Sequence, residues 1–375
     1  MPGELADVRR GLVGVVADTT SISTVNEATN SLSYRGYPVQ DLASSCSFEE
    51  VAYLIWHGEL PDGDELAAFA AAERSRRAVD TTLLDALALQ PVTCHPMDVL
   101  RTAVSFLGAR DPSEDDPSVG ANLAKSLDMM AKLPTVIAAE QRRRRGDAPI
   151  APDPDLGFAE NFFHMCFGSV PEPEVVRCFE VSLVLYAEHG FNASTFTARV
   201  VTSTLSDVYS AVTAAIGALK GPLHGGANEA VMAMLAEIED PDRVSAWLAE
   251  ALASRRKIMG FGHRVYKHGD SRVPTMREAF AQMAAIRGGE RLVALYENLE
   301  AAMFEAKGIH PNLDYPTGPA YHLMGFDIPT FTPIFVMSRI TGWTAHVIEQ
   351  LSANALIRPL SSYVGPPERR VPERA

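Results

Sequence analysis

The chain has 375 residues and a mass of 40.6 kDa, a length that corresponds to two or three domains and allows a large buried core. Hydrophobic residues make up 47% of it and charged residues 21%, which is typical of a folded globular protein and excludes a disordered one. Because 47 Asp and Glu outnumber 33 Lys and Arg, the formal net charge is −14, and such a surface repels nucleic-acid phosphates and anionic lipid.

Signals of export or membrane insertion are missing from the sequence. No window approaches the roughly 18–20 consecutive apolar residues of a membrane span, and residues 1–16 carry charges where a signal peptide has its apolar region. The four cysteines lack CxxC spacing, so we expect free, mostly buried thiols in a reducing compartment. They are Cys46, Cys94, Cys166 and Cys178. These features predict a cytoplasmic protein with no membrane and no nucleic acid as partner.

The first forty residues differ from the rest of the chain. Segments 14–23 and 32–38 are rich in Val, Thr, Ser and Tyr and are separated by a polar stretch at 25–30, which predicts a small β-hairpin. Ser47 and Glu50 then form a capping box at the start of an apolar helix, and Pro61 follows where that helix is expected to stop.

Helical periodicity dominates from there on, and no fixed-period repeat accompanies it. Apolar residues at 3.6-residue spacing predict helices over 65–79, 97–109, 121–133, 173–189, 206–219, 228–240, 242–257, 275–287, 290–304 and 343–356. Acidic or proline-rich segments 111–118 and 146–155 are expected to be loops, and the tail 365–375 is not expected to pack by itself. Roughly a dozen helices and almost no strands indicate an all-α fold.

A run of four arginines, Arg142–Arg145, stands at an expected helix end, where cations suit the helix dipole. A solvated helix terminus is the simpler interpretation, and contact with an anionic ligand is the alternative.

The first chemically informative segment is 221–226, GPLHGG, directly before an amphipathic helix. His224 therefore lies at or near a helix N-terminus, whose partial positive charge opposes protonation and favours a neutral imidazole able to donate a hydrogen bond to an oxyanion. The flanking glycines permit close approach of a ligand. A turn histidine without function remains the alternative.

A second segment, 260–272, places Gly260 and Gly262 before His263 and adds cations at positions 264, 267 and 272. This pattern is typical of an anion-binding loop, although it is not a GxxxxGK[ST] phosphate loop. A third segment, 311–318, holds Asp314 between prolines on an expected irregular loop. Such a carboxylate suits a general base acting on a carbon acid, and a turn former or N-cap is the alternative.

These motifs resemble the citrate synthase family, in its order and at close to its spacings, from about residue 11 to 364. The segments that carry the resemblance are GPLHGGAN (221–228), IMGFGHRVYKHGDSR (258–272), PNLDYPTG (311–318), YAEHGFNASTFTAR (186–199), SRITGW (338–343) and NALIRPL (354–360). The start of the chain, 11–23, with YRGY (34–37) and CSFEEVAYLIWHGELP (46–61), is most similar to the bacterial 2-methylcitrate synthase branch, especially its actinobacterial members.

The resemblance implies a helical homodimer whose small domain, 221–319, is inserted in a large domain formed by 1–220 and 320–375. It implies condensation of propionyl-CoA or acetyl-CoA with oxaloacetate, with no metal and no other cofactor. Asp314 is expected to remove the α-proton, His224 to bind the thioester oxygen and His263 to polarise the ketone.

The remaining site residues are also carried over from the family. Those expected to bind oxaloacetate are His189, Arg272, Arg339 and Arg358, the last supplied by the partner subunit. Those expected to bind CoA are Leu223, Gly260, Gly262, Lys267 and Asn312, with Lys267 standing where other members have arginine.

Three alternatives remain open. A citrate synthase that uses mainly acetyl-CoA differs by one methylene of substrate, which is worth only about 1–3 kcal/mol in a hydrophobic pocket. A non-catalytic binding protein of the same fold is a second possibility, against which the intact His224, His263 and Asp314 argue. A metallohydrolase is a third, but the sequence has no HxH or HExxH spacing.

Overall fold

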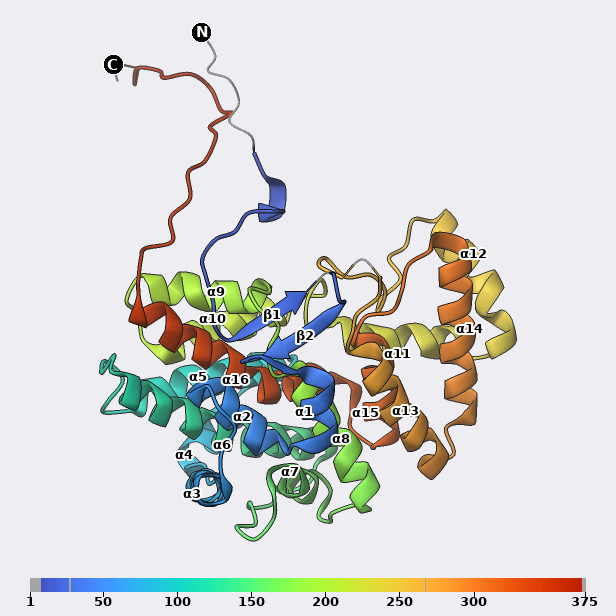
Figure 1. The fold of residues 1–375 in the computed structure, drawn as a ribbon, viewed down its shortest axis with the longest axis horizontal. Coiled ribbons are helices and arrows are strands. Elements are labelled where there is room, and N and C mark those ends of the chain that lie inside the picture. Colours follow the sequence, from blue (N-terminus) through green and yellow to red (C-terminus); the bar gives the residue numbers. More distant parts are fainter. Residues whose placement is uncertain (1–7, 27, 267, 373–375) are drawn as a thin grey trace.

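The computed structural model describes residues 8–26, 28–266 and 268–372, and it is built almost entirely of helices (Figure 1). The helices are α1 (Val39–Ser45), α2 (Phe48–His57), α3 (Gly63–Arg74), α4 (Thr81–Ala88), α5 (Pro96–Arg110), α6 (Val119–Arg145), α7 (Phe158–Phe167), α8 (Pro173–Tyr186), α9 (Ala193–Ser203), α10 (Val208–Leu219), α11 (Ala227–Ile238), α12 (Val244–Ala253), α13 (Val273–Arg287), α14 (Glu290–Lys307), α15 (Asp314–Leu323) and α16 (Phe331–Ser352). Short 3₁₀ helices span Arg10–Leu12, Pro241–Arg243 and Ile328–Thr330. The predicted all-α class is confirmed.

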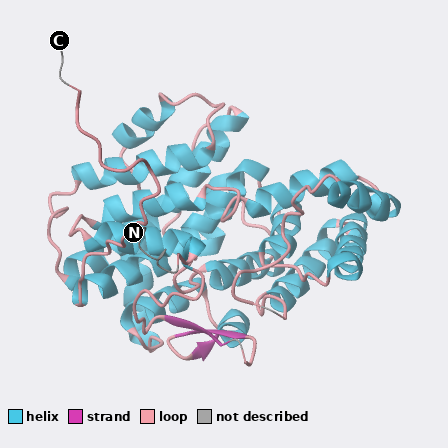
Figure 2. Ribbon diagram, turned by 90° about the horizontal axis from the view of Figure 1, so that it is seen from above, coloured by secondary structure: helices cyan, strands magenta, loops and turns pink. Residues whose placement is uncertain are grey.

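One small antiparallel sheet lies at the edge of the helical body (Figure 2). Its strands are β1 (Ser23–Asn26), β2 (Ser31–Tyr34) and β3 (Tyr37–Pro38), in the order β1-β2-β3. The expected hairpin therefore exists, but its first strand was wrongly placed at 14–23. Residues 13–21 are mostly exposed, and β1 begins only at Ser23, where the backbone finds a partner in Tyr34.

The predicted capping box is confirmed at the start of α2, since Glu50 N donates to Ser47 Oγ over 3.2 Å and Ser47 N donates to Glu50 Oε2 over 2.6 Å. The helix ends before the expected Pro61. Gly58 adopts φ 97°, the left-handed conformation that closes many helices, so His57 is the last helical residue.

All the expected helical segments are helical in the structure, with ends displaced by a few residues, and α6 and α16 are much longer than expected. Periodicity did not reveal α1, α4, α7, α9 or α15, which are short or carry prolines and polar residues.

Helix α16 forms the centre of the molecule and packs against α2, α6, α8, α9 and α10. Its residues Ser338, Arg339, Trp343 and His346 are almost fully buried. Gly342 lies where α16 meets the chain after α8, because a Cβ there would come within 2.6 Å of the backbone oxygen Ala187 O and within 2.2 Å of Glu188 Oε2. Glycine thus lets the two backbones approach closely at this position.

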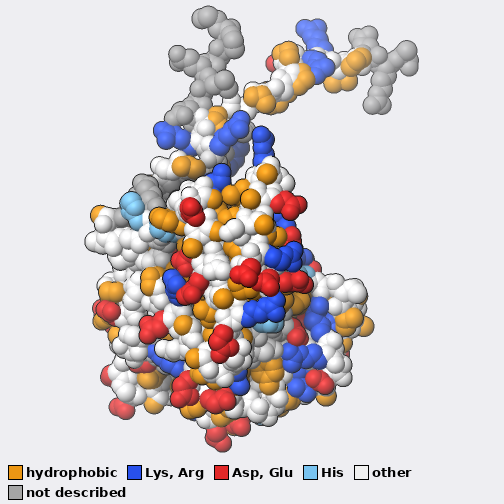
Figure 3. All heavy atoms as spheres, turned by 90° about the vertical axis from the view of Figure 1, so that its right-hand side faces the viewer, with side chains coloured by type: hydrophobic (Ala, Val, Ile, Leu, Met, Phe, Trp, Pro, Cys, Tyr) orange, Lys and Arg blue, Asp and Glu red, His pale blue; other side chains and the backbone are white. Residues whose placement is uncertain are grey.

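Helices α11 to α14 lie together at one side of the molecule (Figure 1). Viewed from that side, acidic and basic side chains are interspersed over the surface (Figure 3). Several are paired, for example Arg256 with Glu237 and Arg277 with Glu297.

The four arginines at the end of α6 are bound by the protein itself. Glu140 accepts hydrogen bonds from Arg143 and Arg144, and the Asp327 carboxylate accepts two hydrogen bonds of 2.9 Å from Arg145. Arg142 donates to carbonyl oxygens. These contacts favour the simpler interpretation of the arginine run as a helix terminus.

Other expectations concern cysteines and membrane spans. All four cysteines are free, and three of them are buried. Across the part of the chain that the structure describes, no helix combines the length and apolar character needed to cross a membrane.

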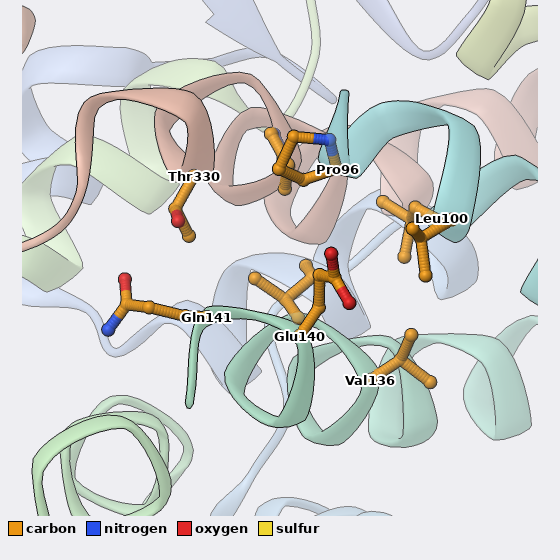
Figure 4. Close-up of a pocket in the computed structure, with 9 residues that line it drawn as sticks. Pro96, Leu100, Val136, Glu140, Gln141 and Thr330 are labelled. Carbon is orange, nitrogen blue, oxygen red and sulfur yellow. The ribbon is translucent and has the colours of Figure 1, made fainter. Parts of the chain in front are cut away.

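A small cavity between α5, α6 and the start of α16 has a volume of about 10 Å³ (Figure 4). Its lining includes Pro96, Leu100, Glu140, Gln141 and Thr330. That volume holds at most one water molecule, so this cavity is not a substrate site.

Candidate active site

Two of the three segments expected to carry site residues, 260–272 and 311–318, are in direct contact. Phe261 and Pro311 form an antiparallel bridge, Asn312 N donates to Gly260 O over 2.8 Å, and Asn312 Nδ2 donates to Gly262 O over 3.0 Å. Gly260 has φ 82°, and a Cβ there would press on Tyr315 within 3.0 Å, so this crossing requires glycine. The loop that bears His263 and the segment that leads to Asp314 are thereby fixed to each other.

Asp314 does not lie on an irregular loop, as expected, but is the first residue of α15. Prolines are compatible with a helix start, because the backbone N–H groups of the first turn have no acceptor within the helix and can be missing without loss of a helical hydrogen bond. Tyr186 Oη, at the end of α8, donates to Asp314 Oδ1 over 2.7 Å. Burial raises the pKa of the Asp314 carboxyl to about 6, against the lowering effects of Tyr186 and Arg272. Such a carboxylate is a stronger base than an ordinary aspartate and is still mostly ionised at pH 7.

His224 lies in the turn before α11 and is held by Ser194 at the start of α9. The His224 Nε2 atom lies 2.7 Å from Ser194 Oγ and 3.3 Å from Ser194 N. Because a backbone N–H can only donate, Nε2 accepts, and the proton of the neutral ring sits on Nδ1. Burial and then the charge of Arg339 lower the pKa of His224 to about 3. The predicted neutral imidazole is thus supported, with burial and the charge of Arg339 as causes.

Phe335 on α16 brings the His224 and Asp314 regions together. Its ring centroid lies 4.0 Å from that of Tyr186 and 6.2 Å from that of His224, and the Arg339 guanidinium lies 4.8 Å above the same ring. Both Tyr186, which binds Asp314, and His224 therefore border one aromatic side chain.

His263 and His189 form the other part of the site. Their ring centroids are 5.0 Å apart, and both pack near Tyr266. His263 Nδ1 accepts from the backbone N–H groups of Val265 and Tyr266, so a neutral ring carries its proton on Nε2 and presents a donor there. Burial, reinforced by Arg272, lowers the pKa of His263 to about 4 and that of His189 well below its usual value.

Two buried arginines complete the cluster. Arg272, 5% exposed, precedes α13, and Arg339, 1% exposed, lies on α16 and donates from Nε to Tyr186 O over 2.6 Å. Burial lowers the pKa of Arg339 to about 10, so it is still charged at pH 7. The two guanidinium groups act electrostatically on His189 and Asp314, and a site with this charge suits a ligand with carboxylates.

Two predicted residues are not brought into this cluster. Leu223, next to His224, is 80% exposed, and Arg358 lies exposed in the extended segment after α16. Lys267 lies outside the described residues. No group of three or more His, Cys, Asp or Glu among the described residues has an arrangement that could hold a metal ion.

Several contacts of the site were not anticipated from sequence. Tyr186, Ser194 and Asp270 were within recognised motifs but had no assigned role, and Phe335 lay outside them. Spacing along the chain gives no signal that Ser194 bonds His224 or that Tyr186 bonds Asp314, because these partners are 30 and 128 residues apart.

Comparison of the chain with known proteins shows its family. A family model described as "Citrate synthase, C-terminal domain" matches residues 11–360. The chain belongs to the citrate synthase family. A 2-methylcitrate synthase from Mycobacterium tuberculosis is 64% identical over 369 residues, 98% of this chain and 93% of the relative. A citrate synthase from Mycolicibacterium smegmatis is 63% identical over 366 residues, 98% of this chain and 97% of the relative.

Solved structures of the citrate synthase family share the fold. Citrate synthase from Thermotoga maritima aligns with a TM-score of 0.89 at 38% identity, covering 97% of this chain and 98% of the other. A ternary complex of citrate synthase from Thermoplasma acidophilum with carboxymethyl coenzyme A and oxaloacetate aligns with a TM-score of 0.93 at 32% identity, covering 97% and 98%. The resemblance seen in the sequence, including that to 2-methylcitrate synthases, is confirmed.

Proposed function

We propose that this chain is a 2-methylcitrate synthase, which condenses propionyl-CoA with oxaloacetate and water to 2-methylcitrate and CoA, and which also accepts acetyl-CoA to give citrate. The observation that carries the proposal is 64% identity to a 2-methylcitrate synthase across 98% of the chain, with acid–base groups and buried arginines clustered as described above. The enzyme is an acyltransferase that converts the acyl group to an alkyl group on transfer.

The first step is removal of the α-proton of the thioester by Asp314. A thioester α-hydrogen is only weakly acidic, so a carboxylate succeeds only when the developing oxyanion is stabilised at the same time. The Nδ1–H of neutral His224 supplies that hydrogen bond, since its Nε2 is already occupied by Ser194. The raised pKa of Asp314, about 6, favours proton transfer to it.

The nucleophilic carbon then attacks the ketone carbon of oxaloacetate. The Nε2–H of His263 polarises the ketone and protonates the alkoxide that forms, because Nδ1 is held by backbone N–H groups. Water then cleaves the thioester and returns a proton to His263, and the proton held by Asp314 passes to the thiolate of the leaving CoA. His189, Arg272 and Arg339 bind the carboxylates of oxaloacetate, and bidentate guanidinium contacts fix its orientation.

The CoA-binding residues are proposed to be Leu223, Gly260, Gly262, Lys267 and Asn312. Acyl-CoA is a substrate, and we propose no metal and no resident cofactor. Domain closure after oxaloacetate binds excludes water until condensation is complete, with 221–319 as the small domain and 1–220 with 320–375 as the large domain.

We propose that the enzyme is a cytoplasmic homodimer in which Arg358 of each chain completes the oxaloacetate site of the other. The extended segment after α16 supports this, because its apolar side chains are exposed: Leu356 is 61%, Leu360 91% and Val364 85% exposed. A second copy of the chain would bury them. Mixed dimers of Arg358→Ala and Asp314→Asn chains are expected to recover activity, since one intact site can form; activity no higher than that of the parent variants would contradict the shared site.

The second candidate is a citrate synthase that uses mainly acetyl-CoA, favoured by the 63% identical citrate synthase from Mycolicibacterium smegmatis. Product identification tests both. Incubation with propionyl-CoA and oxaloacetate should release free CoA and form 2-methylcitrate, detected by mass spectrometry. Chelator treatment should leave turnover unchanged. Absence of product with either acyl-CoA would favour a non-catalytic protein of this fold.

A further inference from the structure

Asp270 is a fully buried carboxylate in the segment between His263 and α13. Its Oδ1 accepts from Arg272 Nε over 2.9 Å and from Arg272 N over 3.1 Å. Its Oδ2 accepts from Arg272 Nη2 over 2.7 Å and from Leu313 N over 3.2 Å. One carboxylate thus holds two groups. They are the side chain of Arg272, which binds oxaloacetate in the proposed function, and the backbone of Leu313, one residue before the proposed base Asp314.

The bonds to Asp270 leave a defined part of Arg272 available. They occupy the edge of the guanidinium formed by Nε and Nη2. The other edge, formed by Nη1 and Nη2, has among the described residues only a 3.4 Å contact from Nη1 to Leu185 O. A guanidinium has five N–H groups in a rigid plane, so fixing one edge orients the other for a second carboxylate.

The bond to Leu313 N connects this pair to Asp314. Leu313 is the N-cap of α15, and Asp314 N donates to Asn312 Oδ1 over 3.1 Å. The start of α15 is therefore held on one side by the Asn312 side chain and on the other by Asp270. A small displacement of a catalytic group costs as much as about 100-fold in rate, which makes such a support important for function.

We propose that Asp270 is a positioning residue that holds Arg272 for the keto-acid carboxylate and the segment bearing Asp314 for proton abstraction, so that both depend on one side chain. The inference rests on the proposed function. It predicts that loss of the Asp270 carboxylate impairs oxaloacetate binding and alters the behaviour of Asp314 together.

Asp270→Asn tests this, because asparagine keeps the size and one acceptor of aspartate but lacks its charge. Calorimetric titration should show oxaloacetate affinity weaker by about 10- to 100-fold, since a misplaced guanidinium loses a charge-assisted hydrogen bond to the ligand. The acid limb of the pH profile of kcat/KM for propionyl-CoA should move to lower pH, because the negative charge of Asp270 raises the pKa of Asp314. A residue that only supports the fold would not move that limb.

Other charged or titratable groups around Asp314 are not replaced in this variant. They are Tyr186 on α8, Arg339 on α16, Arg272 in the same segment as Asp270, and Tyr321 on α15. The shift of the acid limb to lower pH therefore reports the loss of the Asp270 charge, and the weaker oxaloacetate binding reports the displacement of Arg272.

Glu73→Gln is the matched control. Glu73 and Arg77 form another buried carboxylate–guanidinium pair with a 2.7 Å contact, the same distance as in the Asp270–Arg272 pair, but at the end of α3. This variant breaks a pair of the same type and should leave oxaloacetate affinity and the acid limb as in the wild type. Asp270→Asn behaving like Glu73→Gln would overturn the proposal.

Asp270→Glu keeps the test decisive if the asparagine variant does not fold. Glutamate retains the charge, so the acid limb should remain near that of the wild type, while the longer side chain displaces Arg272 or Leu313 and weakens oxaloacetate binding. Wild-type affinity in Asp270→Glu would contradict the positioning role. If the wild-type enzyme itself releases no CoA, the proposed function fails, whereas a failure confined to the Asp270 variants concerns this inference alone.

Discussion

Replacing the proposed base with its neutral isostere should stabilise the protein while it abolishes catalysis. Burial raises the pKa of Asp314 from 3.8 to about 6, so the folded protein holds the ionised carboxylate at a cost. An asparagine side chain at this position would need no ionisation and could still accept the hydrogen bond from Tyr186. We therefore expect Asp314→Asn to be more stable at pH 7 than the wild type and to lose condensation by several orders of magnitude.

The size and sign of the effect follow from proton linkage. Since the folded-state pKa lies above the unfolded-state pKa, the wild type is penalised once the pH exceeds 3.8, and the penalty is fully developed above about 6. With these two pKa values, the buried Asp314 carboxyl lowers the free energy of unfolding of the wild type by about 3 kcal/mol at pH 7 and by about 0.5 kcal/mol at pH 4. The stability gain of the variant should thus shrink as the pH falls.

Urea unfolding of both proteins at pH 7 and pH 4, at one protein concentration, measures this difference. Asp98→Asn is the control, because the Asp98 carboxyl has a pKa lowered by Lys220 against the opposing effect of burial. The same substitution there should destabilise the protein at pH 7. An Asp314→Asn variant less stable than the wild type at pH 7 would refute the raised pKa and with it the account of the base.

Three further predictions concern contacts around the site. Tyr186→Phe removes the donor to Asp314, so the pKa of the carboxyl should rise and the acid limb of the kcat/KM profile should move to higher pH; an unchanged limb would show that the 2.7 Å bond is unimportant for the base. Ser194→Ala removes the 2.7 Å hydroxyl contact that orients the His224 ring, while the Ser194 N–H still fixes its tautomer, and should lower kcat about 10- to 100-fold with oxaloacetate affinity intact, as titration would show. Gly342→Ala forces a Cβ to 2.2 Å from a buried carboxylate oxygen and should cost more than about 3 kcal/mol in urea unfolding, so a neutral effect would contradict the close packing of α16.

Much of the fold could be predicted because long helices such as α14 carry a clear apolar periodicity. The ends were less predictable. Pro134 lies within α6, whose expected segment stopped just before it, yet burial of the helix against its neighbours outweighs the lost backbone bond. The strand expected at 14–23 does not form, because most of its β-forming residues are exposed and have no neighbouring strand among the described residues to pair with.

The candidate site was predictable to the extent that its residues stand in glycine- and proline-bounded segments. His224, His263 and Asp314 are recognisable in this way, and the structure brings their segments together. Their partners were not predictable, because Ser194 and Tyr186 reach them only through the tertiary packing of α8, α9 and α16. Local patterns also gave no signal of the burial and the Arg339 charge that keep His224 neutral.

The central claim is tested most directly by thiol release from CoA in the presence of oxaloacetate, with kcat/KM compared for propionyl-CoA and acetyl-CoA on one preparation. The account predicts turnover of both, with the higher kcat/KM for propionyl-CoA. A higher value for acetyl-CoA would contradict the assignment as a 2-methylcitrate synthase and identify a citrate synthase with the same fold and site.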